Sequence, residues 1–231
     1  MEHIVSLSGG KDSTAMLLMM IERNMPIDHI VCVDMTKEFP EMYDHLRKLE
    51  EYILPLKIDF LKINFDYYLG EHIKRKGKNK GKSGYGWSDF RNRWCTRLKS
   101  RAIKNYVDAI EDETVEYIGI AYDEKHRAYK NLYKDRRPKN VSYPLIEWKI
   151  SENECLKYCY SKGFYFGGLY EHIDRVSCFC CPLSGLDKLR YVYWKRPELW
   201  NIMKKMDQQS YRDFRPDYTL IELEKKFNKE K

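Results

Sequence analysis

The chain has 231 residues, a formal charge of +7, 43% hydrophobic residues and 33% charged residues. This balance excludes wholesale disorder and fits one globular domain with an ample core and a small appendage. No apolar run approaches the ~18 residues of a membrane helix, and a strand-like segment stands where a secretory signal would. We therefore expect a cytoplasmic protein with no membrane partner. Its seven cysteines favour free thiols, a metal or a cluster over disulfides.

Strand and helix patterns alternate along the first half of the chain. The strand patterns lie at 3–7, 29–34, 56–63 and 115–121, and the helical patterns at about 13–23, 40–53 and 96–110. This alternation predicts an α/β fold with a three-layer, doubly wound, mainly parallel sheet.

The rest of the chain carries two further features. The Lys- and Gly-rich segment 74–86 lacks periodicity and is too polar to bury, which predicts a mobile basic loop. From 151 onward the pattern turns helical and contains cysteines. We place a nucleotide-binding α/β domain at 1–175, and a cysteine-containing segment with a helical C-terminal extension at 176–231.

The stretch SLSGGKDSTAMLL, residues 6–18, joins the first strand to the first helix, at the sheet edge where such folds bind ligands. Adjacent glycines let backbone N–H groups approach a phosphate, and the helix start adds a favourable field. Asp12 would repel phosphates unless Mg²⁺ lies between them, although it also suits a helix N-cap. The predicted nucleotide-binding residues of this stretch are Ser6, Ser8, Gly9, Gly10, Lys11, Asp12 and Ser13.

SGGKDS resembles the pyrophosphate loop of the phosphoadenosine phosphosulfate (PAPS) reductase and ATP pyrophosphatase (PP-loop) superfamily. Five later segments resemble its motifs in the right order: VDMTKEFPEMYDHL (33–46), RWCTRLK (93–99), IGIAYDEKHR (118–127), YPLIEWKISENECLKY (143–158) and LYEHIDRVSCFCCP (169–182). The resemblance implies an adenine nucleotide alpha hydrolase-like fold of the HUP-type Rossmann-like class, with ATP or an adenylyl sulfate across the sheet edge.

The resemblance also assigns roles to residues outside the loop. Asp34 and Thr36 would flank the adenosine, although Asp34 also suits a turn that ends a strand. Arg93, Arg97, Lys99 and Arg127 are candidate phosphate or sulfate clamps, and each could also be a solvated charge. The catalytic candidates are Lys11, Asp12, Lys99 and Arg127.

The cysteines suggest a metal centre. Cys178 and Cys181 form a Cys-x-x-Cys pair with Cys180 between them, which alone is ambiguous among zinc, a cluster and a redox pair. Cys95 matches a further cysteine ligand of iron–sulfur members, so the resemblance favours a [4Fe–4S] cluster on Cys95, Cys178, Cys181 and Cys180, with Zn²⁺ second and simple packing as the alternative. The pattern is similar to DNA phosphorothioation-type and phage PAPS reductase-like members. Nearby arginines should favour the thiolate forms.

Cysteines Cys32, Cys155 and Cys159 are read as core residues, although Cys155 and Cys159, one helical turn apart, would also suit a ligand pair.

The resemblance leaves three functions open. No cysteine follows Cys181 to serve as the reductase nucleophile, and Ala121 stands where sulfonucleotide reductases usually carry an arginine. These departures favour an ATP pyrophosphatase that releases AMP and pyrophosphate while adenylating a substrate for sulfur transfer, with tRNA or DNA and a sulfur-donor protein as partners. The alternatives are a sulfonucleotide reductase that uses a partner's thiol and a non-catalytic nucleotide-binding module.

Overall fold

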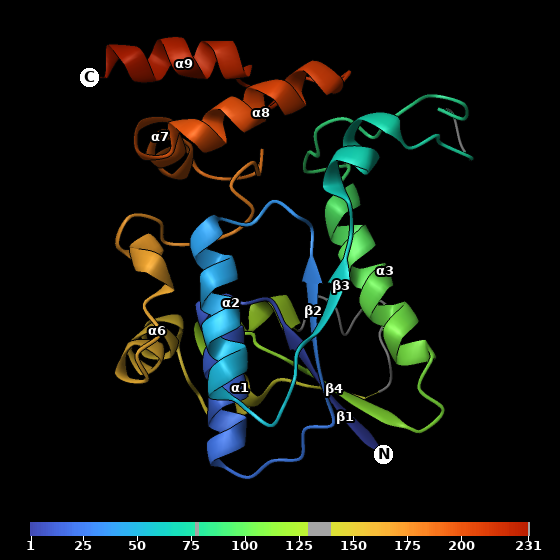
Figure 1. Cartoon of the computed structure of the whole chain (residues 1–231), viewed down its shortest axis with the longest axis vertical. Coiled ribbons are helices and arrows are strands. Elements are labelled where there is room, and N and C mark those ends of the chain that lie inside the picture. Colours follow the sequence, from blue (N-terminus) through green and yellow to red (C-terminus); the bar gives the residue numbers. More distant parts are fainter. Residues whose placement is uncertain (77–78, 129–139, 231) are drawn as a thin grey trace. The chain divides into compact units, whose positions relative to one another are not determined.

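The sheet of this computed structural model, which describes residues 1–76, 79–128 and 140–230, has five strands in the order β3-β2-β1-β4-β5. The β1–β2, β1–β4 and β4–β5 pairs are parallel. Helices flank the sheet in a three-layer arrangement, as predicted (Figure 1). The strands are β1 (Glu2–Leu7), β2 (His29–Asp34), β3 (Asp59–Lys62), β4 (Thr114–Ile118) and β5 (Val141–Ser142).

Helices account for most of the remaining structure. They are α1 (Lys11–Glu22), α2 (Pro40–Tyr52), α3 (Trp94–Asp108), α5 (Pro144–Glu147), α6 (Glu152–Ser161), α7 (Leu186–Lys195), α8 (Pro197–Gln209) and α9 (Leu220–Lys229), with the short turns η1 (Tyr67–Glu71), η2 (Tyr122–Glu124) and η3 (Phe166–Glu171). Sequence signals fix several starts. Pro40 and Pro197 occupy first-turn positions, where the missing N–H costs nothing. A capping box of Ser151 and Glu154 begins α6.

The chain divides into two compact units. The first comprises residues 1–34, 40–61 and 101–169. Its core joins β1 to α1, with Ile4, Met16 and Met20 fully buried, and all of β2 after His29 is buried, as expected of a strand covered on both faces.

The second unit comprises residues 35–39, 62–100 and 170–231 and includes the C-terminal helices. Here Trp200 and Phe227 pack α8 against α9, and Trp87 stacks edge-on against Phe214 with ring centroids 5.0 Å apart. Every helix within the described residues is too short or too polar to cross a bilayer.

Several boundaries differ from the predicted ones. β3 begins only at Asp59, because the Ile58 amide donates to the Glu50 carboxylate (3.2 Å) instead of a neighbouring strand. β4 ends at Ile118, whose carbonyl accepts from Ile120 N in a tight turn (3.0 Å). The short strand β5 had no sequence signal of its own.

The basic loop 74–86 was predicted to be too polar to bury, but its first residue, Lys74, is buried. Lys74 donates to the Tyr211 hydroxyl (2.9 Å), and its backbone pairs with Lys82 (3.0 Å). Residues 77–78 lie outside the described residues, so the predicted mobility stays a prediction.

Candidate functional site

The predicted phosphate loop lies between β1 and α1, at the point where the strand order reverses. From β1 the chain passes to β2 and β3 on one side, and β4 then pairs with the other side of β1. Ligands of open α/β sheets bind in the crevice at such a switch point. The position of SGGKDS in the fold therefore agrees with the position that its chemistry predicts.

Internal hydrogen bonds shape the loop. The hydroxyls of Ser8 and Ser13 share a hydrogen bond (2.9 Å), Ser8 N donates to Ser13 Oγ (3.1 Å), and Ser13 Oγ donates to the Gly10 carbonyl (3.1 Å). Gly9 has φ +78°, a conformation that side chains rarely adopt. Gly10 is the N-cap of α1 and provides no side-chain cap, so the helix begins with its amides beside the loop.

Gly119, just after β4, allows the loop to sit this close to the sheet. A Cβ at this position would lie 2.7 Å from Ser13 Cα and 2.9 Å from Ser13 N. Backbone on both sides leaves no flexible side chain to yield. The end of β4 and the start of α1 therefore approach each other through a glycine.

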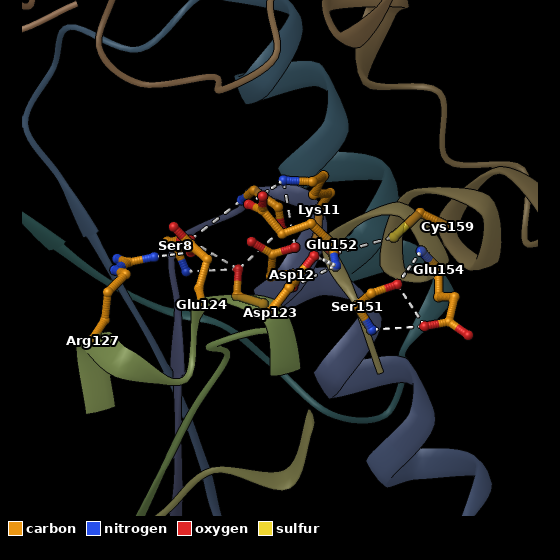
Figure 2. Close-up of polar contacts among 12 residues, drawn as sticks. Ser8, Lys11, Asp12, Asp123, Glu124, Arg127, Ser151, Glu152, Glu154 and Cys159 are labelled. Carbon is orange, nitrogen blue, oxygen red and sulfur yellow. Dashed lines mark hydrogen bonds and ion pairs between the residues drawn. The ribbon is translucent and has the colours of Figure 1, made fainter. Parts of the chain in front are cut away.

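Three carboxylates gather beside the loop. Asp12, Glu124 and Glu152 each offer one oxygen, and these atoms all lie within 4.8 Å of one another (Figure 2). Lys11 lies among them, with Nζ 2.8 Å from Glu152 Oε1 and 3.6 Å from Asp12 Oδ1. Asp123 fixes the start of α6 by accepting from Glu152 N (3.1 Å). The three acids come from α1, η2 and α6 and meet only in the fold.

The surroundings of Asp12 shift its pKa. Burial raises its pKa to about 6; Lys11 opposes the shift, while Glu152 and Glu124 add to it. Burial would lower the pKa of Lys11, but its hydrogen bond to Glu152 and the charges of Asp12 and Glu152 raise it instead. Asp12 Oδ1 is buried and accepts no hydrogen bond from the described residues. A buried carboxylate oxygen of this kind, with two more carboxylates in reach, fits a Mg²⁺ ion.

Other predicted nucleotide contacts of the first unit divide into two groups. Arg127 pairs with Glu124 and so lies beside the carboxylates (Figure 2). Ser6 and Asp34 instead bond within the protein: Ser6 Oγ donates to Glu116 Oε1 (2.5 Å), and Asp34 Oδ1 accepts from the Tyr43 hydroxyl (2.9 Å). Their role in nucleotide binding stays a prediction.

A buried histidine supports the loop from behind. The Thr14 hydroxyl donates to the Gly9 carbonyl (3.3 Å), and His45 Nε2 lies 3.1 Å from that hydroxyl. Because Thr14 gives its hydrogen to Gly9, the ring nitrogen is the donor in the second bond. Burial and then the charge of Lys48 lower the pKa of His45 to about 4, while a hydrogen bond to the Gly9 backbone opposes the shift. His45 is therefore neutral at physiological pH.

The second unit holds the predicted metal ligands. Cys178, Cys180 and Cys181 share one turn, in which Cys181 N donates to the Cys178 carbonyl (3.1 Å). Cys178 Sγ donates to Glu38 Oε1 (3.3 Å), which also pairs with Lys99 Nζ (3.3 Å). Lys99 therefore forms an ion pair with Glu38, the same carboxylate that accepts the hydrogen bond from Cys178.

Lys188 stabilises this turn by hydrogen bonds. Its buried ammonium donates to the Ser177 hydroxyl (2.6 Å) and to the carbonyls of Ser177 (2.9 Å) and Cys178 (2.7 Å). Burial lowers the pKa of Lys188, and the neighbouring cysteines and Glu38 oppose that shift.

The prediction that basic surroundings favour the thiolates is wrong for Cys178. Burial, followed by the negative charge of Glu38, raises the pKa of Cys178 well above its ordinary value despite Lys99. Burial raises the pKa of Cys180 as well. Desolvation at these sulfurs therefore outweighs the positive charges of the lysines near them.

The cysteine spacing bears on the kind of centre. Within the described part of the chain, no three cysteine sulfurs lie within 4.8 Å of one another. A single Zn²⁺ with Zn–S bonds of about 2.3 Å draws its ligands closer than that. A [4Fe–4S] cluster binds each thiolate to a different iron atom, so its ligands stand farther apart. Cys95, Cys178, Cys180 and Cys181 all belong to this unit, and their ligation of a metal centre stays a prediction.

The remaining predicted residues of the second unit are described by their own contacts. Arg97 donates to Asn92 Oδ1 (2.6 Å), and the Arg93 guanidinium lies 5.8 Å from the Phe90 ring centroid. Exposed Thr36 has φ +58°, which is rare for a β-branched residue and is found at strained functional turns. The three cysteines read as core are buried as expected: Cys32, Cys155 and Cys159.

Sequence reasoning missed five residues that contact these sites: Glu152, His45, Glu38, Lys188 and Asp123. Glu124 appears in the sequence analysis only within the segment IGIAYDEKHR (118–127). A usable signal existed for Glu152, which stands at the first position of a capped helix, whereas nothing marked the buried histidine on α2.

Comparisons with known proteins agree with this fold. The chain is 26% identical over 213 residues to the uncharacterized protein MJ0066 of Methanocaldococcus jannaschii; the match covers 85% of this chain and 39% of that protein, so the chain spans about two fifths of this relative. The solved structure of the U34-tRNA thiolase NcsA from Methanococcus maripaludis, with its [4Fe–4S] cluster, superposes with a TM-score of 0.51 at 15% identity, covering 90% of this chain and 71% of that one. The model of the phosphoadenosine phosphosulfate reductase domain matches residues 2–184. The chain belongs to the phosphoadenosine phosphosulfate reductase domain family.

Proposed function

We propose that this protein is an ATP pyrophosphatase that adenylates an acceptor for sulfur transfer. The observation that carries the proposal is the buried Asp12 oxygen, which accepts no hydrogen bond from the described residues and lies beside Glu124 and Glu152 at the phosphate loop. Three carboxylates would repel a triphosphate, and a Mg²⁺ ion between them removes that repulsion.

In the proposed reaction an acceptor oxygen attacks the α-phosphorus of ATP. The new O–P bond forms as the bond from the α-phosphorus to the bridging oxygen breaks, and pyrophosphate leaves. A nucleophilic sulfur at the oxidation level of sulfide then displaces AMP from the adenylated acceptor, with no net redox change. The loop amides beside Gly10 and the Lys11 ammonium stabilise the departing negative charge.

Two further parts of the chain have roles in this proposal. Arg127, held by Glu124, supplies a guanidinium fork for the phosphates. The cysteines Cys95, Cys178, Cys180 and Cys181 hold a [4Fe–4S] cluster, which when bound supplies a soft metal site for sulfur. Lys188 and Glu38 orient the Cys178 turn.

The binding test compares Asp12→Asn with the wild type by calorimetric titration of Mg·ATP. We expect the variant to lose at least tenfold in affinity, because the amide removes a charged ligand of the cation. Asp44→Asn is the matched control, since Asp44 is an exposed aspartate whose ion pair, among the residues that the structure describes, is with Arg47. Equal affinities of Asp12→Asn and the wild type would refute the proposed cation site.

The product test uses Mg·[α-³²P]ATP with total RNA and sulfide under anaerobic conditions. Labelled AMP and an equal amount of unlabelled pyrophosphate, the latter measured by a coupled enzymatic assay, are expected. ADP as the product would contradict the proposal. The family match favours a second candidate, sulfonucleotide reduction with a partner's thiol; release of sulfite from PAPS with thioredoxin, without ATP turnover, would support it instead.

A further inference from the structure

One segment of the second unit carries more positive charge than the whole protein. Ten of the 29 residues from 72 to 100 are Lys or Arg, and one, Asp89, is acidic. The segment therefore has a formal charge of +9, whereas the chain as a whole has +7. Such a concentration on one segment is an electrostatic footprint for a polyanion.

The structure leaves this charge largely uncompensated. Asp89 already pairs with Arg212, which brings a further cation. Lys74 bonds to a tyrosine hydroxyl, and Lys99 pairs with Glu38. The remaining described cations are exposed and form no ion pair with a carboxylate of the described residues: Arg75, Lys76, Lys80, Lys82, Arg91, Arg93 and Arg97.

Exposed aromatic rings lie among these cations. Phe90, between Asp89 and Arg91, is 73% exposed, and the Arg93 guanidinium lies 5.8 Å from its ring centroid. Tyr211 is 59% exposed, with Lys74 Nζ 4.5 Å from its ring centroid. These exposed rings contribute little to the hydrophobic core of the protein. They are suited to stack on a base.

The turn that contains Phe90, residues 89–92, is held by hydrogen bonds. Asp89 Oδ1 accepts from Arg91 N (2.7 Å) and from Asn92 N (2.6 Å), which closes the turn beneath the ring. The next residues are anchored by Trp94, which is buried and donates through Nε1 to the Gly86 carbonyl (2.8 Å). The ring is therefore presented by an ordered turn.

The basic loop 74–86 is also anchored, through the backbone of its last residues. Tyr85 N donates to the Tyr68 carbonyl and Gly86 N to the Leu69 carbonyl, both at 2.9 Å. Gly84 has φ +60°, and a Cβ there would lie 2.2 Å from Leu69 O. Only glycine permits this approach, which holds the basic loop against η1.

From these observations we propose that this basic segment binds single-stranded nucleic acid through its exposed residues Arg75, Lys76, Lys80, Lys82, Phe90, Arg91 and Arg93. The cations contact phosphates and Phe90 stacks on an unpaired base. This inference rests on the proposed function only in naming its acceptor: a nucleic acid whose nucleotide is adenylated and then thiolated. A duplex hides the faces of its bases, and an acidic peptide has none, so the exposed ring favours a single strand over both.

The test measures fluorescence anisotropy of labelled 20-nucleotide RNA, of DNA of the same sequence and of the DNA duplex, without ATP. Arg91→Ala/Arg93→Ala should weaken single-strand binding about tenfold. It should also reduce the slope of log K against log salt by about 1.4, because each lost phosphate contact on a single strand contributes about 0.7. Lys225→Ala/Lys229→Ala, which removes two exposed charges on α9, is the matched control and should leave binding unchanged.

Phe90→Ala separates stacking from charge. It should also weaken single-strand binding about tenfold, yet leave the salt slope unchanged, because it removes no cation. Near-ultraviolet circular dichroism identical to that of the wild type confirms that each variant is folded. Stronger binding of RNA than of DNA, or the reverse, identifies the acceptor polymer.

The inference would be overturned by equal weakening by the α9 control, by tighter binding of the duplex, or by full affinity of Phe90→Ala for the single strand. Polyglutamate that competes equally with the oligonucleotides would also do so, since it would show charge attraction alone. Because ATP is absent, failure here leaves the Mg·ATP and product tests of the proposed function standing, and their failure leaves this binding result standing.

Discussion

His45 should make the protein sensitive to mild acid. The folded state holds the pKa of His45 at about 4, chiefly through burial, whereas the value in an unfolded chain is near 6.5. Between these values the unfolded chain binds a proton that the folded protein does not bind. The free energy of unfolding therefore rises with pH across this window and falls as the pH drops from about 6.5 towards 4.

The magnitude follows from the size of the shift. A change of about 2.5 pKa units corresponds to roughly 3 kcal/mol at 1.36 kcal/mol per unit. The side chain is 5% exposed, so solvent screening removes little of this value. The free energy of unfolding should thus fall by up to about 3 kcal/mol through His45 protonation alone, which is a large fraction of the stability of a typical domain.

His45→Gln isolates this contribution. Glutamine stays neutral at every pH and can still donate to Thr14 through its amide, so the variant should lack the His45 part of the acid dependence. Urea unfolding of both proteins at pH 7.5, 5.5 and 4.5 measures it. The stability gap between wild type and variant should shift by about 2 to 3 kcal/mol in favour of the variant between pH 7.5 and 4.5. Parallel pH profiles would show that His45 is not the buried neutral ring described above.

Two other substitutions test the sheet edge and the cysteine turn. Gly119→Ala should destabilise the protein by about 1 to 3 kcal/mol and weaken Mg·ATP binding, because its Cβ would meet the Ser13 backbone at 2.7 Å, whereas Gly185→Ala, with nothing within 4 Å of its Cβ, should do neither. Thermal unfolding and calorimetry measure both effects, and equal behaviour of the two variants would contradict the close approach. Cys178→Ala should lower the iron content and the absorbance near 400 nm of anaerobically prepared protein by more than half; an unchanged spectrum would remove this cysteine from the ligand set.

The sequence was sufficient for the sheet and the phosphate loop because both depend on local signals. Ile and Val runs at 3–7 and 29–34 predict buried strands, and the glycines and hydroxyls of SGGKDS lie in one short segment whose place after β1 is fixed by the chain itself. Strand ends were less predictable, since a side chain such as Glu50 can capture an amide that the pattern assigns to the sheet.

The carboxylate cluster could not be predicted in this way. Glu124 and Glu152 come from a 3₁₀ turn and from a helix start, where acidic residues are common for purely local reasons. Their meeting with Asp12 depends on the crossover that places β4 beside β1. The prediction about the cysteine thiols failed for a related reason. Charge can be counted along a sequence, but the burial that dominates the pKa of Cys178 belongs to the folded unit.

The charges around the loop explain why cation and nucleotide should bind together. Asp12, Glu124 and Glu152 carry three negative charges when ionised, and Lys11 offsets one of them. A triphosphate that approached this set would meet net repulsion at close range in a partly buried site. A divalent cation held by these carboxylates would neutralise the remaining two charges and would leave the Lys11 ammonium available to the phosphates. Burial and the neighbouring carboxylates raise the pKa of Asp12 while Lys11 opposes the shift, which is the sign expected of a carboxylate whose charged form a bound cation would stabilise.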